Sequence, residues 1–342
     1  MVKMARMTSG EPFVSVVVPT CRRPDLLARC LAALLAQDQP GDSFEILVSD
    51  DAAREQTRRQ LNAWMARARE RRICLRYIAV AGARGPAAAR NAGWRAARGV
   101  IIAFTDDDCI PAPDWLSKGV AAFGPETRPA SERRVDGVCG RLVVPLPDSP
   151  TDYQRNAAQL QQATFVTANC FYRRDMLAAI GGFDERFTMA WREDSDLHFR
   201  LMQRDARLIE VGDVVVTHPI RPAPWGVSVG QQRKSMYNAL LYKKHPDRYR
   251  KYIQAAPPWR YYAIMIALGG MALGLLARRK RLAGLAAALW LGLTAAFCAR
   301  RLRGVSHAPA HIVEMAVTSL VIPPLAVFWR LRGAIKFRVW FL

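Results

Sequence analysis

The stretch Val100-Ile-Ile-Ala-Phe-Thr-Asp106-Asp107-Asp108-Cys109 decides how the first part of this chain folds. Its apolar residues, rich in β-branched side chains, are typical of a strand buried on both faces, and the run ends directly in three carboxylates. Three adjacent carboxylates repel one another, so burying them without a cation is costly. The stretch therefore predicts a central strand that delivers an acidic cluster to one edge of a sheet.

Runs of the same kind precede it at residues 14–19, 44–49 and 73–80, and the segments between them predict helices near residues 24–35, 54–71 and 86–97. This alternation predicts right-handed βαβ units around a mostly parallel sheet. In such sheets ligands bind at the carboxyl ends of the strands. Asp50 and Asp51 also follow a strand directly, so we expect both acidic groups at the ligand-binding edge. The fold class is therefore α/β.

Beyond residue 111 the pattern is mixed. It predicts strands at residues 138–144 and 207–216, and helices at residues 175–180, 193–204 and 231–242, the last of them amphipathic. The whole chain divides into three predicted parts: a catalytic domain at residues 13–225, a connecting region at 226–258 and a membrane-associated helical region at 259–342.

The acidic cluster suits a hard divalent cation. Carboxylate oxygens are preferred ligands of Mg²⁺ and Mn²⁺, which commonly bridge protein carboxylates to phosphates. A bare acidic turn is the plainer explanation of three aspartates, but the buried strand before them favours a site. Glu193, Asp194 and Asp196 form a second acidic group at a helix start. Helix capping explains one acidic residue at that position, but it does not explain three. An aspartate near a substrate hydroxyl can act as a general base.

Residues 83–93 combine small side chains with Arg84 and Arg90 at a helix start, an arrangement that favours phosphate groups. An ordinary loop and a helix-face arginine would account for it equally well. His218 follows the strand at residues 207–216 and precedes a proline. A lone histidine is more often structural than functional, and spacing alone does not decide its role.

Three apolar runs, at residues 261–277, 282–299 and 312–329, are each close to the shortest length that spans a bilayer, about 17 residues. Aromatic residues such as Trp259, Trp329 and Trp340 lie near their edges, as interfacial anchors do. Three such runs are hard to bury in so small a soluble domain. Two topologies remain open: three spans, or an interfacial or re-entrant first run followed by a hairpin of the other two. We favour the second, because three spans would place Arg278 to Arg281 opposite the catalytic domain, against the positive-inside rule.

The net charge of +21 fits either a nucleic-acid binder or a protein on an anionic membrane. Basic residues crowd the apolar runs, and no zinc-finger or RNA-binding signature is found, so the membrane is favoured. The seven cysteines are scattered without a CxxC pair, which favours a reducing, cytosolic compartment. Residues 1–12 lack an apolar core, so we expect no signal peptide.

In order and spacing, five segments resemble the family 2 glycosyltransferases of GT-A fold, over roughly residues 13–220. These segments are VSVVVPTCRRPDLLARCLAALLAQ, FEILVSDDA, GPAAARNAGWRAARGVIIAFTDDDCIPAPDWL, TANCFYRRDMLAAIGGFDERF and REDSDLHFRL. Two departures stand out. The second strand is followed by Asp50-Asp51-Ala52-Ala53 instead of Asp-Asp-Gly-Ser, and residues 231–235 lack the QxxRW motif of processive members. Transfer of one or a few sugars is therefore expected.

The resemblance implies a role for each matching residue. Asp194 would be the catalytic base, with Glu193 in support. Donor binding would fall to Pro19, Thr20, Arg22, Asp50, Arg90, Asn91, Asp106 and Asp107. The metal, Mn²⁺ or Mg²⁺, would be held by Asp106, Asp108 and His218. The acceptor would contact Trp191 and Asp196.

The activity implied is inverting transfer of a sugar from a UDP-, GDP- or dTDP-linked donor to a hydroxyl of a glycan or lipid-linked acceptor. We expect it at the cytosolic face of the inner (plasma) membrane, in synthesis of an envelope polysaccharide. The alternatives are a non-catalytic membrane scaffold that binds nucleotide-sugar and, less favoured, a basic nucleic-acid-binding protein. Intact Asp106, Asp108 and Asp194 argue against the scaffold, and no nucleic-acid partner is expected.

Overall fold

The computed structural model describes residues 13–82, 85–124 and 134–341, so Arg84 and residues 1–12 of the sequence analysis lie outside the described residues. The chain forms two compact units. The first joins Met1–Pro145 to Gln159–Pro219, and the second joins Leu146–Ala158 to Ile220–Leu342. A division by contacts does not show which parts fold independently, so the predicted domain boundaries stay a prediction.

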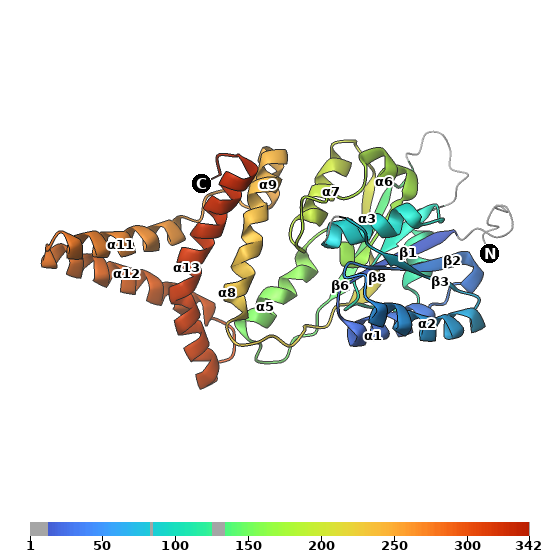
Figure 1. Ribbon diagram of the computed structural model, residues 1–342, viewed down its shortest axis with the longest axis horizontal. Helices are drawn as coiled ribbons and strands as arrows, with labels where there is room; N and C mark the ends of the chain where they lie inside the picture. The colour runs from blue at the N-terminus through green and yellow to red at the C-terminus, as the bar shows by residue number, and fades with distance from the viewer. Residues whose placement is uncertain (1–12, 83–84, 125–133, 342) are drawn as a thin grey trace. The chain divides into compact units, whose positions relative to one another are not determined.

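The first unit is built on one sheet (Figure 1). In the described part of the chain this sheet has eight strands, in the order β3-β2-β1-β4-β7-β6-β8-β5. The first four strands in this order run parallel to one another. Among the remaining pairs, β6 and β8 are parallel, whereas β4–β7, β6–β7 and β5–β8 are antiparallel. The strands are β1 (Val14–Thr20), β2 (Phe44–Asp50), β3 (Cys74–Ala79), β4 (Ile101–Phe104), β5 (Ile110–Pro111), β6 (Gly137–Val143), β7 (Cys170–Arg173) and β8 (Leu208–Thr217).

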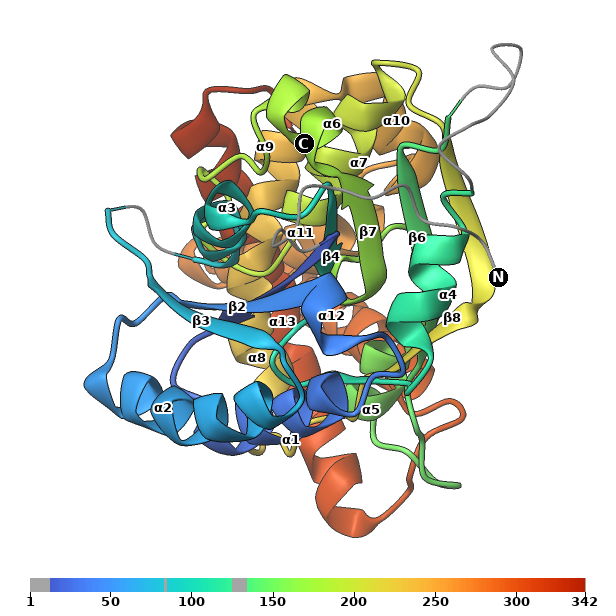
Figure 2. The same ribbon diagram turned by 90° about the vertical axis from the view of Figure 1, so that its right-hand side faces the viewer.

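Helices cover both faces of this sheet, because successive strand side chains point to opposite sides. One core packs α1 (Pro24–Leu35), α2 (Glu55–Glu70) and α4 (Trp115–Ala121) on one face. A second core packs α3 (Pro86–Ala96), α6 (Arg174–Ile180) and α7 (Glu193–Met202) on the other (Figure 2). Neighbouring residues of β1 divide accordingly: Val16 and Val18 join the first core and Val17 the second.

Strand register places the site. Thr20 of β1 pairs with Asp50 of β2, and Val17 pairs with Phe104 of β4. The carboxyl ends of these three parallel strands therefore lie at one edge, and Asp106 follows β4 there. β5 runs antiparallel to β8, with Ile110 opposite Thr217, so the residues just before β5 meet the residue just after β8.

The predicted α/β fold and its parallel βαβ units are confirmed, and the three cross-over helices begin and end close to their predicted positions. Sequence reasoning missed β5 and β7. β7 has only four residues and runs straight into the charged pair Arg173-Arg174, so neither length nor alternation marked it as a central strand.

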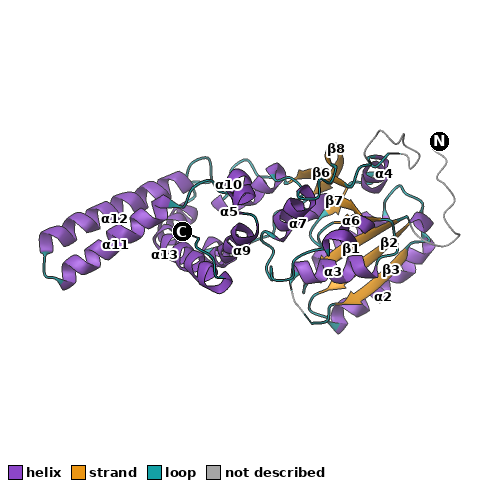
Figure 3. Cartoon of the chain, turned by 90° about the horizontal axis from the view of Figure 1, so that it is seen from above, coloured by secondary structure: helices purple, strands orange, loops and turns teal. Residues whose placement is uncertain are grey.

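The described residues of the second unit form helices joined by loops and contain no strand, as Figure 3 shows by colour. The predicted helix at 231–242 is present as α8 (Val227–Gln231), a 3-10 turn (Gln232–Ser235) and α9 (Met236–Lys244), but α9 is not amphipathic because its apolar side chains are spread around the helix. The helices are α5 (Asp152–Ala158), α8 (Val227–Gln231), α9 (Met236–Lys244), α10 (Pro246–Tyr252), α11 (Trp259–Leu276), α12 (Lys280–Arg301) and α13 (Pro309–Phe337).

α11 and α12 form a tight antiparallel hairpin, and α13 crosses its base and runs beside α8 and α9 (Figure 1). The predicted pairing of the second and third apolar runs is therefore wrong: the paired runs are the first and second. Two local features explain this. The connection between α11 and α12 is only three residues long, and Gly274 lets the backbones approach, since a Cβ there would lie 2.9 Å from the backbone nitrogen of Ala283.

All three of these helices are long and apolar enough to cross a membrane, by length and composition. Large apolar side chains on the hairpin face outward: Leu273 is 67% exposed and Leu276 81%. An apolar surface of this kind is unfavourable in water and indicates association with a membrane. The number of helices that cross the bilayer stays a prediction.

Candidate active site

Asp107 ties the end of β4 to the end of β1. Its carboxylate accepts a hydrogen bond from the Thr20 hydroxyl at 2.8 Å and an ion-paired bond from Arg23 at 3.0 Å. Burial raises the pKa of Asp107 to about 6, although Arg23 opposes the shift. Both oxygens of Asp107 are thus used inside the fold. Arg22, which was predicted to line the nucleotide, is exposed with a positive φ of 58°, and its role stays a prediction.

Arg90 joins the two acidic groups that the sequence singled out. From α3 it donates to Asp106 at 2.7 Å and to Glu193 at 3.0 Å, with its own side chain almost fully buried. Burial alone would raise the pKa of Asp106, but Arg90 outweighs it and holds that pKa below its usual range. Burial, helped by the charge of Asp194, raises the pKa of Glu193. The Nε of Arg90 and the Oε2 of Glu193 are buried without a hydrogen-bond partner.

Asp194 stands beside this group in the first turn of α7 and is half-buried. Its Oδ1 accepts hydrogen bonds from the backbone N–H of Ser195 at 2.7 Å and from the Ser195 hydroxyl at 3.3 Å. These two bonds orient the carboxylate, and Asp194 keeps part of its surface exposed. An oriented, partly accessible carboxylate oxygen is what a general base requires.

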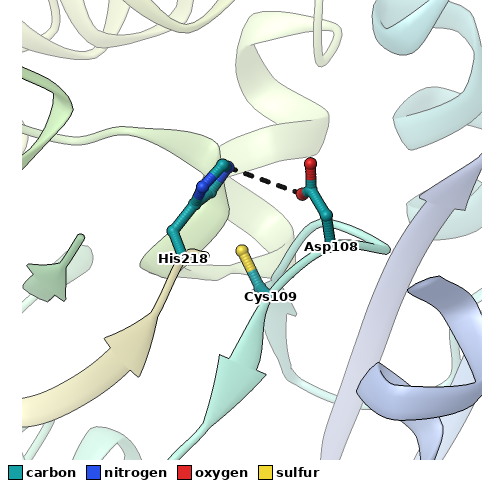
Figure 4. A group of neighbouring side chains, drawn as sticks. All are labelled: Asp108, Cys109 and His218. Atoms are coloured by element: carbon teal, nitrogen blue, oxygen red, sulfur yellow. Dashed lines mark ion pairs between the residues drawn. The ribbon is translucent and has the colours of Figure 1, made fainter. Parts of the chain in front are cut away.

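Asp108, Cys109 and His218 converge where β4 leads into β5 and β8 ends (Figure 4). Their ligand atoms all lie within 4.8 Å of one another, and the Nε2 of His218 is 3.5 Å from Asp108. A carboxylate and an imidazole fit Mn²⁺ well, and Mg²⁺ less well because it favours oxygen. Burial and the nearby Asp106 raise the pKa of the Cys109 thiol far above its usual range. Mn²⁺ and Mg²⁺ prefer oxygen and nitrogen to sulfur, so Asp108 and His218 are the better ligands of the three. Asp106 lies outside this group because its carboxylate is turned to Arg90.

Asp50 and Asn91, both predicted to bind the donor, are occupied by local structure. Asp50 is fully buried and accepts bonds from the backbone N–H groups of Ala52 and Arg54 and from the Tyr77 hydroxyl. Burial and Asp50 together raise the pKa of Tyr77 to about 12, which keeps this donor protonated. Asn91 uses its amide to hold the loop at 183–185 and to accept a bond from Trp94.

Asp51 contacts the glycine loop that the sequence marked as phosphate-binding. Its Oδ1 accepts a bond from the backbone N–H of Gly85 at 2.8 Å. Gly85 has a φ of 109° and would clash with the backbone of Thr188 if it carried a Cβ, so the position needs glycine. The contact fixes the entry into α3 and hence the position of Arg90.

The predicted acceptor residues differ sharply in exposure. Trp191 is 37% exposed, and the Arg192 guanidinium stacks over its ring at 4.6 Å. Asp196 is fully buried and pairs with Arg200 at 2.8 Å. Arg200 in turn donates to backbone carbonyls at the end of α6, so Asp196 anchors α7. Pro19 is buried inside β1. Among these residues Trp191 has the surface that a sugar would need.

Sequence reasoning missed Arg23 and Cys109 as members of this site, whereas Asp51 was expected at the ligand-binding edge. Arg23 could have been found from its place directly before the helix-starting Pro24. Nothing in the sequence marked Cys109, because its part depends on the antiparallel pairing of β5 with β8.

A doubly covered sheet binds its ligands at the carboxyl edge of its strands, where this chain has the acidic cluster and His218. The family comparisons identify the class of protein. The model of "Glycosyl transferase family 2" matches residues 15–181, and that of "Glycosyl transferase family group 2" matches residues 150–331. The chain belongs to the family 2 glycosyltransferases and is an enzyme that transfers sugar.

Among characterised relatives, the chain is 30% identical over 227 residues to the glycosyltransferase AglE of Haloferax volcanii, covering 63% of this chain and 70% of that protein. It is 26% identical over 296 residues to the validoxylamine A glucosyltransferase of Streptomyces hygroscopicus subsp. limoneus, covering 76% and 61%. The solved mannosyltransferase PcManGT from Pyrobaculum calidifontis, in complex with GDP-Man and Mn²⁺, shares the fold with a TM-score of 0.54 and 21% identity, covering 96% of this chain and 88% of that one.

Proposed function

We propose that this enzyme transfers a sugar, with inversion, from a nucleoside-diphosphate donor to a hydroxyl of a glycan or lipid-linked acceptor at the cytosolic face of the inner (plasma) membrane. The observation that carries the proposal is the chain Asp106–Arg90–Glu193 beside Asp194, which joins the predicted donor site to the predicted base. The seven cysteines are all free thiols, which supports a cytosolic face. The acceptor is expected to belong to an envelope polysaccharide.

Asp194 is the general base of the proposed reaction. It takes the proton from the acceptor hydroxyl, whose oxygen forms the new bond to the anomeric carbon. The bond from that carbon to the diphosphate oxygen breaks, and its electron pair leaves with the nucleoside diphosphate. Because the oxygen attacks opposite the leaving group, the anomeric configuration inverts. Glu193 is too buried and too firmly bound to Arg90 to take this proton, so it positions Arg90.

Asp108 and His218 would hold Mn²⁺ or Mg²⁺, and Asp106 adjoins them. A bound divalent cation offsets the charge of the departing diphosphate. The exposed Arg22 and the glycine loop before α3 lie at the donor edge and would contact the nucleotide and its phosphates. Thr20, Asp50, Asn91, Asp107 and Asp196 act on this proposal as positioning residues, since their polar groups are engaged in the fold. Trp191 remains the proposed contact for the acceptor sugar.

The test uses the full chain in lipid nanodiscs with UDP-, GDP- and dTDP-linked sugars, with Mn²⁺, with Mg²⁺ and with EDTA. Donor turnover should require a divalent cation, and proton NMR of the transferred sugar should show the inverted anomer. Asp194→Asn should lower turnover by about 10²–10⁴-fold, the usual contribution of a general base. The exposed Asp213→Asn is the matched control and should keep wild-type turnover. Full activity of Asp194→Asn, or a product with retained configuration, would refute the mechanism.

A further inference from the structure

The second unit contains a pocket that the proposed chemistry does not use. It has a volume of about 480 Å³ and lies between α5, the segment at 220–228 and the first turns of α13. Trp225 lines it with an indole that is 59% exposed. His311 and Glu314 of α13 line it with polar groups. An open indole beside a few oriented polar groups is the composition of a binding pocket for a small polar molecule.

His311 carries a hydrogen-bond donor that the fold leaves unused. The backbone N–H of Asp152 donates to its Nε2 at 3.2 Å, so the hydrogen of the neutral ring is on Nδ1. Only 6% of His311 is exposed, and its buried Nδ1 has no hydrogen-bond partner. Leaving a buried donor unpaired is costly. The cost is recovered when a ligand oxygen accepts from Nδ1.

Glu314 places an acceptor next to that donor. Its Oε1 accepts from the backbone N–H of Gly226 at 2.7 Å, which fixes the carboxylate. Its Oε2 lies 3.6 Å from the Nδ1 of His311, too far for a hydrogen bond between them. The pocket therefore presents one donor and one acceptor side by side.

The charges around the pocket disfavour an anionic ligand. Glu314 and Asp152 line it, with Arg221 as the cation among the described lining residues. Arg301 is close in the fold but is taken up by Asp152, at 2.9 Å, and by hydroxyl groups. A phosphate group would meet the Glu314 carboxylate and is disfavoured.

We propose that this pocket binds a neutral pyranose ring of the acceptor glycan. Two adjacent hydroxyls of such a ring match the pair of groups, one donating to Glu314 and the other accepting from His311. The C–H face of the ring lies against the Trp225 indole. The acceptor assignment rests on the proposed transferase function, whereas the binding itself does not.

The experiment measures binding without any sugar donor. The full chain is placed in phosphatidylcholine–phosphatidylglycerol nanodiscs, because the headgroups of maltoside detergents would compete. Methyl α- and β-D-glycopyranosides of glucose, mannose and galactose are titrated by saturation-transfer-difference NMR. The wild type should bind at least one of them with a millimolar Kd. Trp225→Ala should weaken that binding at least tenfold and Glu314→Gln at least fivefold.

Two controls separate a local effect from a damaged protein. Trp340→Ala removes another exposed tryptophan of the same unit, outside the pocket, and should keep the wild-type Kd within twofold. All three variants should bind a nucleoside diphosphate as the wild type does. The conservative Glu314→Gln keeps the side-chain volume, so its loss of binding reports on the carboxylate.

Three results would overturn the proposal. The wild type binds a nucleoside diphosphate but none of the glycosides; Trp225→Ala binds glycoside as well as Trp340→Ala does; or inorganic phosphate displaces the glycoside. Glycoside binding that depends on Trp225, in a protein that neither binds nor turns over any nucleotide-sugar, would instead reject the transferase function and leave the pocket intact.

Discussion

Two buried arginines, one in each unit, show how a reactive site differs from a structural one. Arg90 bridges Asp106 and Glu193, yet its Nε and the Glu193 Oε2 have no hydrogen-bond partner. Arg301 donates to Asp152, Thr318, Ser319 and Ser228 and stacks over a phenylalanine ring. The terminal nitrogens of Arg301 thus each serve two partners. The Arg90 group therefore has buried polar atoms without partners, and this lowers the stability of the fold. A bound substrate can form hydrogen bonds with these atoms.

The largest effect is expected from Arg90→Met. It leaves Asp106 and Glu193 buried without their cation, a loss of about 3–5 kcal/mol for a buried pair. The shifted carboxylates should also reduce transfer by about 10³-fold, since transition-state electrostatics depend on fixed geometry. Steady-state transfer and thermal unfolding measure the two effects.

Arg90→Lys is the control for charge. Lysine keeps the positive charge but cannot bridge two carboxylates with a fixed fork. It should recover most of the stability and little of the activity. If the lysine variant were fully active, the bridging geometry would have no part in catalysis.

Arg301→Met tests the structural side of the comparison. It exposes no reactive group but leaves the buried Asp152 with only the longer contacts to Arg155, at 3.8 Å, and Asn156, at 3.4 Å, which should cost about 3 kcal/mol. The Tm of the second unit should fall by roughly 6–12 °C. Donor hydrolysis at low temperature should stay within about threefold of wild type, in contrast to Arg90→Met.

The double variant Arg301→Met with Asp152→Leu sharpens this test, since replacing both partners by apolar groups is often neutral. Its Tm should return most of the way to wild type. A Tm as low as that of the single variant would mean that Arg301 acts through its hydroxyl partners and not through Asp152.

Glu193→Gln should change how stability depends on pH. The pKa of Glu193 is raised in the folded enzyme by burial and by Asp194, so the folded state binds a proton more tightly than the unfolded chain. Wild-type stability therefore falls as pH rises from the unfolded pKa of about 4.3 to the raised folded pKa, by at most about 1.4 kcal/mol per pH unit. Glutamine cannot titrate, so the part of the slope due to Glu193 should vanish, while the part due to the raised pKa of Asp107 should remain.

Denaturant unfolding between pH 5 and pH 8 measures the Glu193 effect. Exposed Glu55→Gln is the control, because its side chain is 61% exposed and pairs only at the surface. The control should keep the wild-type slope. Parallel pH curves for wild type and Glu193→Gln would show that Glu193 does not titrate in this range.

The sequence predicted what depends on local pattern. Apolar runs and the polar residues that end them predict the strand before Asp106 and the helix at 193–202. These two elements place the two acidic groups at the edge of the sheet. It could not predict that Asp107 and Asn91 turn inward, because which oxygen meets which donor depends on side-chain packing. The α11–α12 pairing was missed because the apolar runs alone do not indicate which two helices pack together. The short connection between α11 and α12 and the close approach at Gly274 determine the pairing.

The smallest effect is expected from Cys109→Ala, which tests whether the Cys109 sulfur is a ligand of the metal. The sulfur lies with Asp108 and His218, but sulfur is a soft ligand. Mn²⁺ is a hard ion that prefers oxygen and nitrogen, so the thiol should bind it weakly. Cys109→Ala should leave the Mn²⁺ concentration for half-maximal activity within about threefold, whereas His218→Ala should raise it at least about tenfold. A tenfold rise for Cys109→Ala as well would make the thiolate a true ligand, and the metal site would then be selective for softer ions.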